Sequence, residues 1–254
     1  MASVPLSDSA LAAVKKSLRK EYPDVRSSHL SEALAASLGR RTYAALLTDV
    51  KAQVNDPEIE LLDDVRFDVR LQAFGYPADR EFSFELLMDQ PDCVISTMPL
   101  SGFDIEFRST RHKAWRNLMV LTINEGIRQK LFSLRPYDNR WPGADPESQG
   151  HRGTSHVFDF VLPDGHLALG YVSDAGFGEL TIQAAVNPKG DWVKVSNAGF
   201  LAGDVFAHGW LERERGTYLQ ASPEMFNCRN ALVKVLAEMD VVPKGFGDRG
   251  RVIV

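Results

Sequence analysis

Two histidines and an aspartate, His151, His156 and Asp159, are the closest set of side chains in this sequence that could do chemistry. Two imidazoles and a carboxylate can hold Zn²⁺ or perform acid–base catalysis. His151 falls in a Gly- and Pro-containing connection over residues 135–155, and the other two fall on an expected strand. Because side chains alternate across a strand, His156 and Asp159 should point to opposite faces. We therefore predict no metal site and no cofactor, and a small-molecule enzyme or sensor at the 135–160 connection stays an alternative function.

Two further motifs give no chemistry. The segment Gly245–Gly250 matches the phosphate-binding pattern G-x-G-x-x-G. That pattern needs a helix directly after it, and Arg251–Val254 leave no room for one. Cys93 and Cys228 lie far apart and outside any metal-ligand spacing, which argues against a disulfide framework or a zinc site.

The composition is that of a globular chain: 254 residues, 44% hydrophobic and 25% charged, with a net charge of −5. These values exclude a collagen-like or wholly disordered chain and suggest one or two domains. Residues 1–8 show no secretory signal. The best apolar run, Leu118–Ile123, is far shorter than the roughly 18 residues of a spanning helix. We expect a cytoplasmic protein that makes no membrane contact.

The modest net charge conceals blocks of both signs. The net charge is +3 over residues 1–54, −9 over 55–110, +5 over 111–140 and −4 over 141–254. The two basic blocks could meet an anionic partner. None of the blocks is an unbroken run of like charge, which favours the alternative that they are ordinary solvated helix faces.

The periodicity of the apolar residues changes near residue 55. Residues 7–54 have the spacing of three helices, over about 11–21, 30–38 and 41–53. Beyond residue 60, most segments alternate with the period of two that is typical of strands. The sequence therefore predicts the α+β class, with a three-helix module over 1–54 and an α+β domain over 60–254.

Within the larger domain, the pattern predicts a hairpin, because Asp164-Gly165 between two alternating segments is a strong turn signal. Tyr137 and Trp141 lie on no periodic face and are candidates for surface stacking of bases. Short strands are predicted over 67–71, 82–84 and 105–107, an antiparallel meander over 156–162, 167–172, 180–186 and 192–195, and helices over 114–134 and 222–240.

One segment, Ser28–Leu47, carries a Leu-Ala-x-x-Leu-Gly core that resembles a helix-turn-helix. It is also similar to a helical module that opens many uncharacterised plasmid and integrative-element proteins and accompanies some glyoxalase-like sequences. In a helix-turn-helix the second helix presents its first residues to phosphates or base edges, which here implies Arg40, Arg41 and Thr42. The chain departs from the pattern where Ala45 and Thr48 replace branched apolar residues.

These observations lead to one leading hypothesis. We expect a non-enzymatic accessory protein, from a mobile genetic element, that binds nucleic acid or a protein partner through Arg40, Arg41, Thr42 and Lys51 of its basic module. The second alternative is a subunit of a larger assembly, whose acidic segment over 55–110 meets a basic partner. The sequence leaves the oligomeric state open.

Overall fold

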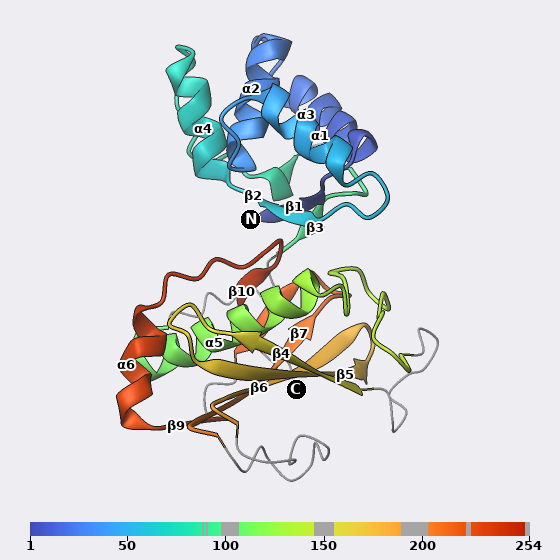
Figure 1. Ribbon diagram of the computed structural model, residues 1–254. Coiled ribbons are helices and arrows are strands. Elements are labelled where there is room, and N and C mark those ends of the chain that lie inside the picture. The colour runs from blue at the N-terminus through green and yellow to red at the C-terminus, as the bar shows by residue number, and fades with distance from the viewer. Residues whose placement is uncertain are drawn as a thin grey trace. The chain divides into compact units, whose positions relative to one another are not determined.

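The computed structural model describes residues 1–87, 89, 91–97, 107–144, 155–188, 203–221 and 225–251. The chain divides into two compact units (Figure 1). Unit 1 comprises Met1–Met98 and Lys244–Phe246, and unit 2 comprises Pro99–Pro243 and Gly247–Val254. Both combine helices and strands, so the α+β prediction is confirmed. Among the described residues, no helix has the length and apolar character that crossing a membrane would require.

Unit 1 packs helices against a small antiparallel sheet with strand order β2-β1-β3. Its core is a single cluster of apolar side chains drawn from nearly every element of the unit. The elements are β1 (Ala2–Pro5), α1 (Asp8–Glu21), α2 (Ser27–Ser37), α3 (Tyr43–Ala52), β2 (Ile59–Leu62), α4 (Asp64–Ala73), the 3₁₀ helix η1 (Phe84–Leu86) and β3 (Ile95–Ser96).

The boundary between the units lies at residue 98. The sequence predicted a division near residue 55. The acidic segment after residue 55 belongs to unit 1 because β2 pairs with β1 and α4 packs on α2. Phe67 and Leu71 of α4 are buried in the same cluster as Leu34, whereas Val69 is 58% exposed. Burial at i and i+4 is the helical spacing, so the predicted strand over 67–71 is wrong.

Unit 2 consists of an antiparallel meander, β4-β5-β6-β7-β8, extended by β10, which runs parallel to β8; β9 pairs with β7. The hairpin around Gly165 is confirmed, and the fourth strand of the meander is β7. The elements are α5 (Thr110–Arg128), β4 (Ser155–Val161), β5 (Leu167–Gly176), β6 (Glu179–Val186), β7 (Val205–Glu212), β8 (Tyr218–Ala221), β9 (Phe226–Cys228), α6 (Asn230–Glu238) and β10 (Gly247–Arg251).

Several details of unit 2 differ from the prediction. The predicted helix over 222–240 is shorter, because Phe226–Cys228 form strand β9 and α6 starts at Asn230. Trp141, a surface candidate, is only 2% exposed. The predicted strands over 105–107 and 192–195 lie outside the described residues, except for Phe107.

Helix α5 crosses one face of this sheet (Figure 1). The contact depends on Gly209 of β7, since a Cβ there would lie 3.1 Å from Cζ2 of Trp115 and 3.2 Å from Cε of Met119. The buried Trp115 donates a 3.0 Å hydrogen bond from Nε1 to the carbonyl of His208. Most strand residues on this face are apolar, among them Val172, Ile182 and Leu211, as expected for the side of a sheet that packs on a helix.

Candidate nucleic-acid interface

Helices α2 and α3 are joined by a tight turn at Gly39. Gly39 has a φ of 74°, a conformation that a residue without Cβ adopts at little cost. The turn is closed by hydrogen bonds from Gly39 N to Ala36 O, 2.9 Å, and from Arg40 N to Ala35 O, 2.8 Å. Two helices joined by a short turn that contains Gly match the arrangement expected of the segment.

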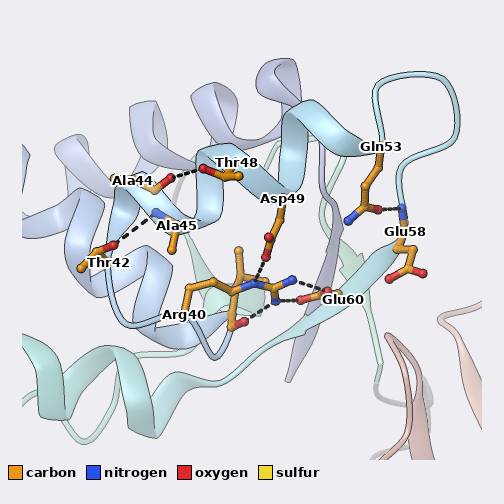
Figure 2. A network of polar contacts seen from close by, with 10 residues as sticks. Arg40, Thr42, Ala44, Ala45, Thr48, Asp49, Gln53, Glu58 and Glu60 are labelled. Atoms are coloured by element: carbon orange, nitrogen blue, oxygen red, sulfur yellow. Dashed lines mark hydrogen bonds and ion pairs between the residues drawn. The ribbon is translucent and has the colours of Figure 1, made fainter.

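Thr42 has a structural role at the start of α3. Its hydroxyl accepts a 3.2 Å hydrogen bond from Ala45 N and so caps the helix (Figure 2). The carboxylate of Glu32, from α2, accepts from Tyr43 N at 3.2 Å. The Glu32 carboxylate therefore already occupies the N-terminus of α3, where a bound anion is favoured. A phosphate near this helix would have to be held by side chains.

Arg40 is engaged within unit 1 (Figure 2). Its Nε donates to Oδ2 of Asp49 at 2.8 Å, its Nη2 donates to Oε1 of Glu60 at 2.8 Å, and its Nη1 contacts Leu38 O and Glu60. The hydrogen bond to Glu60 raises the pKa of the guanidinium further above its ordinary value. With a side chain only 20% exposed and two carboxylates against it, Arg40 ties β2 to α3, and its charge is compensated inside the protein.

The outer face of α3 has a different character. Leu46 and Val50 are buried against the rest of unit 1, and Ala44, Ala45 and Thr48 are exposed. Thr48 donates to the carbonyl of Ala44 at 3.1 Å. These three exposed positions, together with the exposed Lys51 and Ala52, carry no acidic side chain, and the adjoining Asp49, whose side chain is 43% exposed, is paired with Arg40. Small side chains let another molecule approach the helix backbone closely.

Cations flank this face. Arg41 precedes α3 and Lys51 lies in its last turn, and both side chains are exposed with no ion-pair partner among the described residues. From Tyr43, the first residue of α3, to Lys51 the helix rises about 12 Å, at about 1.5 Å per residue. Arg70 of α4 donates to the backbone carbonyl of Arg41 at 3.3 Å. Arg70 was missed from the sequence because α4 was predicted to be a strand in another domain.

The second basic block, residues 111–140, is largely engaged in unit 2. Arg116 forms an ion pair with Asp248 and donates to Val241 O at 2.6 Å. Arg128 pairs with Glu125. These contacts hold α5 to its neighbours or lie along α5 itself, so this block offers fewer free cations than its net charge suggests.

The histidine candidates do not form one site. His156 and Asp159 are three residues apart on β4 and lie on opposite faces of the sheet, as predicted. His151 lies outside the described residues. In the described part of the chain, no three His, Cys, Asp or Glu side chains are close enough together to hold a metal ion.

Comparisons with known proteins add no relative: no protein-family model, no curated protein sequence and no solved structure matches this chain.

Proposed function

We propose that the protein is a non-enzymatic nucleic-acid-binding accessory protein, and that the outer face of α3 contacts double-stranded DNA. The observation that carries the proposal is this face itself, with exposed small residues between Arg41 and Lys51, beside an Asp49 carboxylate whose charge is paired with Arg40. The turn at Gly39 and the cap by Thr42 fix the start of α3, the helix that carries this face. A rigid helix is what insertion into a groove about 12 Å wide requires.

The roles proposed for the basic residues differ. Arg41 and Lys51 contact phosphates, and Arg70 adds a cation beside Arg41. Arg40 is a positioning residue, because its guanidinium is held by Asp49 and Glu60. The resemblance of residues 28–47 to a helix-turn-helix supports the same function.

The test is fluorescence anisotropy with a labelled DNA duplex of mixed sequence, titrated at a series of salt concentrations starting near about 50 mM. The affinity should fall steeply with salt, because bound phosphates release counterions. Replacing both Arg41 and Lys51 by Ala should weaken binding and reduce the slope of log K against log salt by about 1.8, at roughly 0.9 for each lost phosphate contact.

The control is Lys16→Ala, which removes an exposed cation from α1, outside the proposed face. This variant should bind DNA with the affinity and salt slope of the unmodified protein. If the duplex does not bind at low salt, or if Lys16→Ala reduces the slope as much as the double variant does, the proposal is wrong. A protein partner for the same face would then be the next hypothesis, tested by native mass measurement of complexes.

A further inference from the structure

The face of the unit 2 sheet that points away from α5 carries two neighbouring rows of mainly polar side chains. Gly209 faces α5, so its strand neighbours His208 and Trp210 face the other way. The pairing register aligns Val157, Tyr171, Gln183 and His208 in one cross-strand row. The next row contains Ser173, Thr181, Trp210 and Gln220. We call these two rows the polar rows.

Two atoms at the centre of the polar rows have no partner. Oε1 of Gln183 and Nε2 of His208 are both buried, and neither makes a hydrogen bond within the described structure. Gln183 as a whole is only 6% exposed. A buried polar group without a partner destabilises a fold by about the cost of its desolvation, and few such groups survive in native proteins. Two of them side by side on neighbouring strands point to a role outside stability.

The surroundings define what could satisfy these atoms. Directly opposed side chains on paired strands have Cβ atoms about 5 Å apart, so Gln183 and His208 can address neighbouring atoms of one ligand. The rings of His208 and Trp210 lie 4.4 Å apart, tilted by 47°, and add an aromatic surface beside the amide. Burial lowers the pKa of His208 and so favours the neutral imidazole. The polar rows contain no lysine or arginine.

We propose that the polar rows bind a small, uncharged, planar heterocycle with a hydrogen-bond donor next to an acceptor, as found on the edge of a nucleobase. The amide of Gln183 pairs with that edge, in the way that Gln pairs with the edge of adenine. His208 completes the contact, and the ligand ring packs against Trp210. Thr181 and Ser173 are partly exposed, and we place the entry of the small molecule on their side of the rows.

The experiment is isothermal titration of the full chain with adenine, cytosine and uracil at millimolar concentration, with glucose as a non-planar comparison. At least one base should bind, and glucose should not. Gln183→Met keeps the length of the side chain and removes its polar atoms, so the affinity for that base should fall about tenfold or more. His208→Phe should also weaken binding. Asn227→Ala, at an exposed position on β9 that faces the same way, is the matched control and should bind normally.

Thermal unfolding of the same variants separates binding from structure. If Gln183 serves a ligand, Gln183→Met removes an unpaired buried group, and the melting temperature should stay the same or rise. A melting temperature that falls by several degrees would assign Gln183 to the core and overturn the proposal. Failure of all three bases to bind, or binding of glucose alone, would overturn it as well. Neither outcome bears on DNA binding by unit 1, which is measured separately.

Discussion

Each unit contains a buried or half-buried arginine at a junction of elements, and the two are stabilised differently. In unit 1, Arg40 lies between the carboxylates of Asp49 and Glu60. In unit 2, Arg213 follows β7, is 2% exposed, and donates mainly to uncharged groups. We call the region around Arg213, with the adjoining ends of β5, β6 and β7, the β5–β7 corner.

The contacts of Arg213 fix a connection to the sheet. It donates to Gly178 O at 2.7 Å, to Ser133 O at 2.9 Å and to Oδ1 of Asn139 at 2.8 Å. Asn139 in turn donates to Asp174 at 2.7 Å. Burial lowers the pKa of Arg213 to about 10, although nearby carboxylates act in the opposite direction.

The same corner holds two carboxylates on one side of the sheet, Glu179 and Glu212. Burial, and then the charge of Glu212, raise the pKa of Glu179 to about 7, while a 2.7 Å hydrogen bond from Gln220 opposes the shift. At the α2–α3 turn, by contrast, pairing raises the pKa of Arg40. Direct pairing with carboxylates therefore holds Arg40 in its charged form. Burial without a directly bonded ion of opposite charge instead moves the pKa of Arg213 and of Glu179 toward neutral pH.

The largest expected effect is that of Arg213→Met in the β5–β7 corner. The variant leaves three acceptors without their donor in a buried site, and we expect unit 2 to lose about 3 to 5 kcal/mol of stability. The measurement is urea unfolding followed by circular dichroism. Arg215→Met, at an exposed position, should change stability by less than about 0.5 kcal/mol. Equal effects of the two substitutions would show that the buried contacts contribute little.

Arg40→Met should have a smaller effect, on unit 1. It leaves Asp49 and Glu60 without their cation, but these carboxylates are 43% and 23% exposed and can gain water. We expect a loss of about 2 kcal/mol, measured in the same way. Because the Arg40 contacts are ion pairs, the loss should shrink at high salt, whereas the Arg213 loss should not. A salt-independent loss at Arg40 would remove the distinction between the two regions.

Glu179→Gln tests the titration at the β5–β7 corner and should have the smallest effect. The pKa of Glu179 is higher in the folded state, so its protonated form favours folding. This contribution to stability is complete below the pKa of the unfolded state and is lost as the pH rises through about 7. The melting temperature of the variant should therefore match that of the unmodified protein near pH 4 and exceed it at pH 8. Solvent screening limits the gain to on the order of 2 °C.

The control for this substitution is Glu238→Gln on α6, where the carboxylate is 68% exposed. It should leave the pH profile of unfolding unchanged. If the difference in melting temperature between Glu179→Gln and the unmodified protein stays constant from pH 4 to pH 8, the pKa of Glu179 is not raised.

The sequence predicted the class of the fold and the hairpin of unit 2, because period-two alternation and Asp-Gly turns are local signals. It failed at α4, where Phe67, Val69 and Leu71 alternate by chance and the helix is recognised only from burial against α2. Arg40 could not be separated from Arg41 by sequence, since its carboxylate partners are 9 and 20 residues away. The Gln183–His208 row was equally hidden, because it depends on strand register.

The hydrogen bond from Trp115 to the backbone of His208 has a practical consequence. The indole lies on one face of the sheet and the imidazole of the same strand on the other, so a single peptide layer separates them. A molecule that displaces the β7 backbone at His208 also shifts the carbonyl that the indole touches. Trp115 and Trp210, which lies in the polar rows, thus provide built-in optical probes, and the emission spectrum of the chain can report occupancy of the polar rows without any added label.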